Sequence, residues 1–176
     1  MKHRECCRLI ALVVLFMICE NAYAIDDEDS RNSLRELNGI AIIVEHLNEE
    51  VVGEGLTEIF IRAPVMVQLH KAGIPVLLIE QWSKDLNIPH LYINANVVKM
   101  PMEGYIYNIS MELRQRVTLR RSPSILCSAG TWSTACLGKT AELGDIQKTI
   151  QEAMAKFITA YLSVNPKKGP QKESTN

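Results

Sequence analysis

The sequence lacks the short motifs that carry common enzyme chemistry. It has no G-x-S-x-G nucleophile elbow, no G-x-G-x-x-G dinucleotide loop and no G-x-x-x-x-G-K-[ST] phosphate loop. Among the histidines after residue 24, no two stand at H-x-x-H or H-E-x-x-H spacing and none lies beside a cysteine. The sequence therefore indicates no metal site and no cofactor. Because catalytic residues can come from distant parts of a chain, these absences disfavour an enzyme without excluding one.

The chain also has no apolar run long enough to cross a bilayer. Its run Leu9–Cys19 holds 11 residues and would rise about 17 Å as a helix, against a hydrocarbon core of about 30 Å. A small-x-small pattern follows at residues 22–24, as signal peptidase requires. Three basic residues precede the run: Lys2, Arg4 and Arg8. We therefore predict a signal peptide over residues 1–24, an exported protein that begins at Ile25, periplasmic or secreted, and no transmembrane segment after cleavage.

An excess of charge of one sign is absent as well. The formal net charge is −1, which excludes the strongly basic class of nucleic-acid-binding proteins. The distribution is nevertheless uneven: residues 25–103 hold 6 basic and 13 acidic side chains, and residues 104–176 hold 10 and 5. The acidic excess begins at Asp26–Asp29, which we interpret as part of a solvated acidic leader over residues 25–35.

Cysteine is scarce in the exported part, where only Cys127 and Cys136 remain. An oxidising compartment would allow a disulfide between them. A single extended strand would hold them about 30 Å apart, too far for a bond. A hairpin with residues 130–133 at its tip would instead place them opposite each other. Both arrangements are compatible with the sequence, so the disulfide is a prediction that depends on the local fold.

Hydrophobic patterning predicts one α+β domain over residues 36–164. Buried strands are expected at residues 39–44 and 74–80. A helix should lie between them, capped by Thr57 and ended by Gly73. Pro64 falls inside this helix and either kinks it or marks a restart. Residues 81–89 are expected to form a loop.

Strict alternation predicts two long strands of a sheet. Residues 90–98 alternate, and residues 105–120 alternate over a longer stretch. In the second stretch one face is largely apolar, with Tyr105, Tyr107, Ile109, Met111, Leu113, Gln115, Val117 and Leu119. A two-residue period of that length indicates one face on a core and one face exposed. Residues 122–124 interrupt the pattern, and residues 125–133 are a candidate return strand.

A last helix is expected from Gly144-Asp145 to Asn165-Pro166, because apolar residues recur at helical spacing from Ile146 onward. Residues 165–176 are predicted to be a disordered polar tail. Two helices with one apolar face each favour a two-layer sandwich. We predict a mostly antiparallel sheet with both helices on one face.

The polar face of the two alternating strands is the candidate binding surface. Its amide, hydroxyl and phenol groups suit hydrogen bonds to a glycan or to another protein, and its guanidinium groups suit carboxylates, phosphates or an anionic surface. The candidate binding residues are Tyr92, Asn94, Arg114, Arg116 and Arg120. The alternative is that this face is only the solvated side of the sheet, with Arg114 paired to Glu112.

Several stretches together resemble a group of small exported bacterial proteins without an assigned activity. In order they are LNGIAIIVEHL, GLTE, LHKAGIPVL, PHLYIN, YNISMELRQRVTLRR, AGTWS and FITAYLSVNP, and they extend over most of residues 35–166. The resemblance implies a periplasmic setting and an α+β fold, and it assigns no catalytic residue. The order of elements is also similar to small periplasmic modules that serve envelope assemblies, which is a likeness of fold alone.

Two functions follow from these observations. The first is a non-enzymatic accessory or binding protein of the cell envelope, which uses the polar sheet face or a sheet edge to meet a protein, a glycan or an anionic surface. The second is a small exported hydrolase with a site assembled from distant residues such as His90, Glu112 and Cys127. The missing motifs favour the first.

Overall fold

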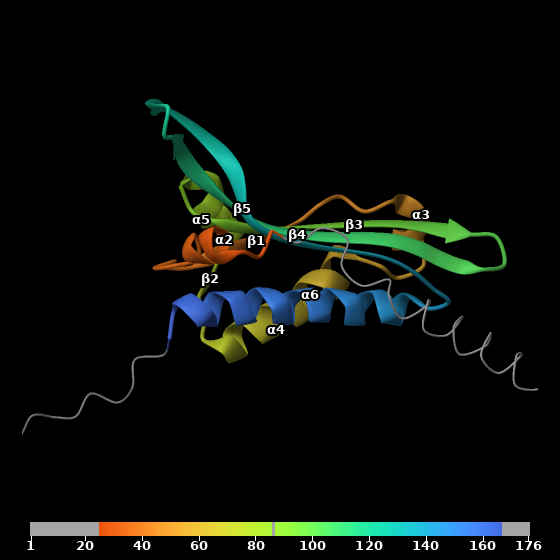
Figure 1. Cartoon of the computed structure of the whole chain (residues 1–176). Coiled ribbons are helices and arrows are strands. Elements are labelled where there is room, and N and C mark those ends of the chain that lie inside the picture. The colour runs from red at the N-terminus through yellow and green to blue at the C-terminus, as the bar shows by residue number, and fades with distance from the viewer. Residues whose placement is uncertain (1–24, 86, 167–176) are drawn as a thin grey trace, which may run out of the picture.

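The computed structural model describes residues 25–85 and 87–166, so the predicted signal peptide and residues 167–176 of the predicted tail lie outside the described residues. Within them the chain has an α+β fold (Figure 1). Two long helices, α4 (Glu58–Ala72) and α6 (Leu143–Val164), cover one face of a five-stranded sheet, as predicted. Three short helices complete it: α2 (Glu28–Asn32), α3 (Glu49–Gly53) and α5 (Ile79–Lys84).

The sheet is mixed, so the expectation of a mostly antiparallel sheet is wrong in this respect. Its strand order is β2-β1-β3-β4-β5. β1 is parallel to both β2 and β3, whereas β3, β4 and β5 form an antiparallel meander. The parallel part arises because the chain leaves β1 through α4 and leaves β2 through α5, and such crossovers restore the strand direction. The strands are β1 (Ile40–Val44), β2 (Val76–Leu77), β3 (His90–Met100), β4 (Gly104–Leu119) and β5 (Ser122–Thr140).

The core lies between the sheet and the two long helices. The predicted alternation is confirmed over residues 90–98 of β3 and residues 108–114 of β4, where every second side chain is buried. The buried set on these strands is Leu91, Ile93, Ala95, Val97, Ile109, Met111 and Leu113. Trp132 of β5 contributes the largest buried side chain and packs edge-on against Phe157 of α6, with ring centroids 5.2 Å apart.

Helix α4 has the predicted caps. The hydroxyl of Thr57 accepts a hydrogen bond from the backbone N–H of Phe60 at 3.2 Å, and Gly73 ends the helix with φ 78°. The helix runs through Pro64 without a restart. The strand predicted at residues 74–80 is shorter than expected, because the chain leaves the sheet after Leu77 and turns into α5. Part of the predicted loop at residues 81–89 is therefore helical.

Strand β5 runs without a break through the residues that were a candidate hairpin tip. Leu113 pairs with Trp132 and Arg114 pairs with Gly130, so Thr131 is the extra residue of a β-bulge. Cys127 and Cys136 thus lie on one strand, at opposite sides of the bulge. The hairpin that a disulfide between them requires is therefore not formed, and the two cysteines are not bonded to each other.

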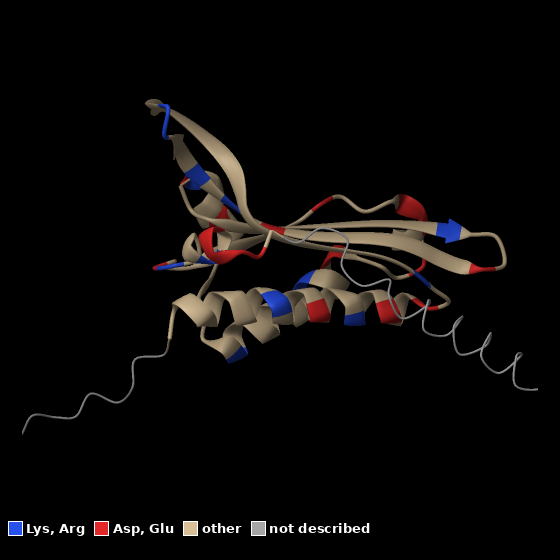
Figure 2. Ribbon diagram, in the orientation of Figure 1, with Lys and Arg blue, Asp and Glu red and all other residues tan. Residues whose placement is uncertain are grey.

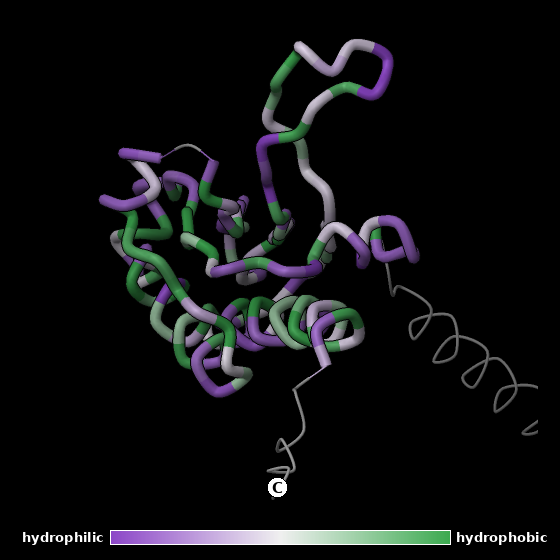
Figure 3. Tube along the Cα trace, turned by 90° about the vertical axis from the view of Figure 1, so that its left-hand side faces the viewer, coloured by the Kyte–Doolittle hydropathy of each residue, from purple (hydrophilic) through white to green (hydrophobic). Residues whose placement is uncertain are grey.

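Beyond the bulge, β4 and β5 bend out of the sheet as a two-stranded ribbon, here called the arm (residues 115–129). It rises on the side opposite α4 and α6 and projects from the rest of the molecule (Figure 1). Figure 2 shows basic and no acidic residues along it. Figure 3 shows hydrophobic segments in the arm that lead to a hydrophilic end.

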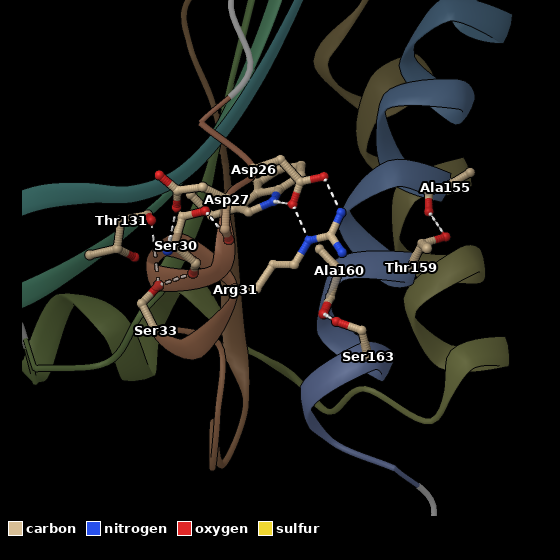
Figure 4. A network of polar contacts seen from close by, with 11 residues as sticks. Asp26, Asp27, Ser30, Arg31, Ser33, Thr131, Ala155, Thr159, Ala160 and Ser163 are labelled. Atoms are coloured by element: carbon tan, nitrogen blue, oxygen red, sulfur yellow. Dashed lines mark hydrogen bonds and ion pairs between the residues drawn. The ribbon is translucent and has the colours of Figure 1, made fainter.

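The segment before β1 is docked on the domain through Ile25 and Asp26, whereas Asp27, Glu28 and Asp29 of the acidic cluster are exposed (Figure 4). The backbone of Ile25 exchanges two hydrogen bonds with Ser133 on the outer edge of β5, at 3.0 and 3.2 Å. The Asp27 carboxylate caps α2. The Asp26 carboxylate accepts hydrogen bonds from Arg31 at 2.7 and 2.8 Å and from the indole N–H of Trp132 at 3.1 Å. The Arg31 bonds in particular hold the pKa of Asp26 below its usual value.

Candidate binding face

The face of the sheet turned away from α4 and α6, here called the open face, is built from alternate residues of β3, β4 and β5. The register of β3 and β4 brings together the side chains that the alternation predicted as neighbours. The opposed pairs are His90 with Arg114, Tyr92 with Glu112, Asn94 with Ser110, and Asn96 with Asn108. Tyr92, Asn94 and Arg114 of the predicted binding residues therefore share one surface.

Tyr92 and Arg114 form the centre of this face. The guanidinium carbon of Arg114 lies 4.0 Å from the centroid of the Tyr92 ring, a cation–π contact. The Nε of Arg114 donates a hydrogen bond to Glu112 at 2.9 Å. These two contacts fix the plane of the guanidinium. Its two terminal nitrogens have no hydrogen-bond or ion-pair partner among residues 25–85 and 87–166, so they are available for bidentate binding.

Glu45, which follows β1, adds an acceptor to the same place. Its carboxylate raises the pKa of the Tyr92 hydroxyl above its usual value, with burial as the second cause. The Oε2 atom of Glu45 is buried and has no hydrogen-bond partner in the described part of the chain. A buried carboxylate oxygen without a donor is costly, so this atom favours a ligand that brings an N–H or O–H group.

Helix α5 carries Trp82 onto the open face beside His90. The indole Nε1–H donates to Nδ1 of His90 at 3.1 Å, and the rings meet edge-on with centroids 5.1 Å apart. The imidazole that accepts this bond carries its proton on Nε2. Burial first, and the charge of Arg114 second, lower the pKa of His90, so the neutral ring is the stable form.

Polar side chains without a hydrogen-bond partner among the described residues extend the open face away from Tyr92 and Arg114. Asn94, Asn96, Asn108 and Ser110 make no side-chain hydrogen bond to the described residues, and both Asn96 and Asn108 are exposed. Farther along, the open face becomes apolar. Val98, Ile106 and Leu137 are 59%, 41% and 60% exposed there. Along the open face the side chains thus change from charged and aromatic at the centre, through amides, to aliphatic at the far end.

Arg116 and Arg120 are not part of this cluster. Both are exposed on the arm, beyond the bulge that bends it away from the sheet. The arginines among the predicted binding residues are therefore divided into Arg114 on the open face and a separate group on the arm. The alternation of β4 could not show this, because the bulge that separates them lies in β5.

The residues of the hydrolase alternative are not brought together. His90 and Glu112 lie on the open face, two register positions apart, because His90 pairs with Arg114 and Glu112 pairs with Tyr92. Cys127 lies on the arm opposite Val117, an odd-numbered position of β4, so its side chain is on the other side of the ribbon from Glu112. No cluster of three histidine, cysteine or acidic residues suited to a metal ion exists in the part of the chain that the structure describes.

Sequence reasoning missed Glu45 and Trp82 as members of the face. The signal for Trp82 was its place in a polar segment, which was interpreted as a loop. Among the helices of the described residues, none combines the length and the apolar character that crossing a membrane requires. No protein-family model matches the sequence. A search of curated proteins likewise finds no significant match.

Proposed function

We propose that the protein is an exported, non-enzymatic binding protein of the cell envelope, and that the open face around Tyr92 and Arg114 is its binding surface. The observation that carries this proposal is the guanidinium of Arg114, which Tyr92 and Glu112 hold in place while its two terminal nitrogens have no partner among the described residues. A donor pair fixed in this way binds a planar anion without a further loss of side-chain freedom.

The neighbouring groups define the chemistry of the ligand. Arg114 suits a carboxylate, the partnerless oxygen of Glu45 suits a hydroxyl or amine, and the Tyr92 ring offers an apolar contact. Successive amides on β3, Asn94 and Asn96, repeat about every 7 Å along the strand. An acidic glycan or an extended, carboxylate-bearing segment of an envelope protein fits this combination.

The export of the protein is supported by the basic start, the short apolar run and the Ala-Tyr-Ala pattern of residues 1–24. The hydrolase alternative lacks this kind of support, since the Cys127 nucleophile that it requires is on the other side of the β4–β5 ribbon from Glu112.

Site-specific photo-crosslinking in the native envelope tests the proposal. A photoreactive residue at exposed Asn96 should capture a discrete partner or glycan, and the same residue at Glu152, exposed on α6, should not. Arg114→Ser should abolish the capture at position 96 while the protein stays folded. Capture that is equal at both positions, or that survives Arg114→Ser, would reject the open face as the binding surface.

A further inference from the structure

The arm is a cationic projection without acidic side chains of its own. Between Glu112 and Glu142 the sequence contains no aspartate or glutamate. The arm carries Arg116, Arg120 and Arg121, all exposed, and none of the three forms an ion pair within the described residues (Figure 2). Three unpaired guanidinium groups on one projecting ribbon, two of them at its tip and Arg116 nearer its base, produce a local positive potential.

The end of the arm also exposes aliphatic side chains. Ile125 and Leu126 are each 47% exposed, and Pro123 beside them is exposed. Leu126 pairs with Thr118, and Ile125 lies in the register shift that follows, where residues 123–125 have no partner on β4. An isolated two-stranded ribbon is only marginally stable in water. Exposed aliphatic groups at its end therefore favour a second surface against which the arm is held.

Charge and hydropathy together identify that surface. The unpaired arginines of the arm favour an anionic surface. The exposed aliphatic residues of the arm favour a partly apolar environment. The boundary between phosphate headgroups and acyl chains offers both within a few ångströms, and arginine-rich amphipathic elements bind there. An acidic soluble polymer would satisfy the arginines and leave Ile125 and Leu126 in water.

We infer that the arm docks the protein on an anionic phospholipid membrane, with Arg116, Arg120 and Arg121 on the lipid phosphates and with Ile125 and Leu126 at the headgroup boundary. This surface is separate from the Tyr92–Arg114 site, so one chain would hold a membrane and a ligand at the same time. Docking needs no rearrangement of the domain, because the arm already projects from it (Figure 1).

Vesicle co-sedimentation of the exported protein, purified after processing, tests this inference. The vesicles contain phosphatidylcholine alone or with about one third phosphatidylglycerol. We expect binding only to the anionic vesicles. Each arginine replaced by glutamine should lower the partition coefficient about five-fold, and the triple variant about 100-fold.

A matched control carries the same loss of charge elsewhere: Arg35→Gln, Lys71→Gln and Lys84→Gln, all exposed positions outside the arm. It should bind anionic vesicles within a few-fold of the wild type, because its cations do not touch the membrane. A second variant, Ile125→Ser with Leu126→Ser, keeps every charge and should weaken vesicle binding about ten-fold or more. Circular dichroism should show that the arm variants and the matched control are all folded.

Several outcomes would overturn the inference. They are absence of binding to anionic vesicles, equal binding to neutral vesicles, and an equal loss in the control and arm variants. A soluble polyanion such as dextran sulfate, bound as tightly as the vesicles and without effect of Ile125→Ser and Leu126→Ser, would assign the arm to acidic polymers instead. The arm variants should retain the crosslink at position 96. Loss of vesicle binding can then be distinguished from loss of ligand binding at the open face.

Discussion

Replacing Asp26 with alanine should destabilise the whole domain, although the residue lies in a segment that sequence composition marks as solvated. The Asp26 carboxylate accepts three hydrogen bonds, two from Arg31 and one from the indole of Trp132. Trp132 is fully buried, so its N–H would lose its acceptor without gaining access to water.

The expected magnitude follows from these two partners. A buried donor left without an acceptor costs about 1–3 kcal/mol. The ion pair with Arg31 is partly exposed, at 39% and 27% for the two side chains, and adds at most about 1 kcal/mol. We expect Asp26→Ala to lower the free energy of unfolding by about 1–4 kcal/mol. Arg31→Ala, which spares Trp132, should lower it by about 1 kcal/mol or less.

Urea denaturation followed by tryptophan fluorescence measures both variants, because Trp132 is one of only two tryptophans. The pH dependence gives a second check. The pKa of Asp26 is lowered by Arg31, so its contribution is complete above the unfolded-state pKa and disappears as the pH falls through the folded-state value. The difference between wild type and Asp26→Asn should therefore be constant near pH 7 and shrink below about pH 4. If Asp26→Ala and Arg31→Ala cost the same, the bond to Trp132 contributes nothing and the reasoning fails.

Three further predictions concern the core, the open face and a turn. Leu113→Ala should cost about 2–5 kcal/mol in chemical denaturation, because the side chain is fully buried under the helices; a near-neutral result would mean that β4 is reversed. Arg114→Ser should raise the pKa of His90 toward 6.5 in an NMR titration, and an unchanged midpoint would contradict the coupling. In the wild type the lowered pKa of His90 means that stability decreases as the pH falls through about 6.5 toward the folded-state value. Gly104→Ala should lower the melting temperature sharply, at a cost of about 2–3 kcal/mol, because φ is 84° and a Cβ would lie 2.2 Å from the Thr140 carbonyl oxygen. Gly144→Ala, where nothing lies within 4 Å, should leave it unchanged or slightly higher.

The long strands and the caps of α4 could be predicted from the sequence because their signals are local. The alternation around Met111 identifies the buried face of β4, and Thr57 and Gly73 mark the ends of a helix by their own backbone chemistry. From the same alternation, Tyr92 and Arg114 were correctly placed on one surface, because the turn near Gly104 sets the register of β3 and β4.

The errors share a physical cause, which is that the deciding partner is distant in sequence. Gly130 was compatible with a hairpin tip, but in the structure it lies opposite Arg114, with Thr131 as a bulge that only the pairing with β4 reveals. Asp26 was interpreted as solvated because its local neighbours are acidic, whereas its partner Trp132 is 106 residues away. Leu78 could continue a strand or cap a helix, and local composition does not distinguish these.

The bridge between Ile25 and Ser133 also constrains the order in which the molecule is completed. A chain that is synthesised from its amino end delivers Ile25 long before the strand that receives it. The acidic segment must therefore wait, unattached, until β4 and β5 have paired and Trp132 is buried. Once the segment is bound, it closes part of an outer sheet edge that would otherwise pair with another chain. The Ile25–Ser133 bridge would thus be among the last contacts to form. A molecule that lacks it would be incompletely folded.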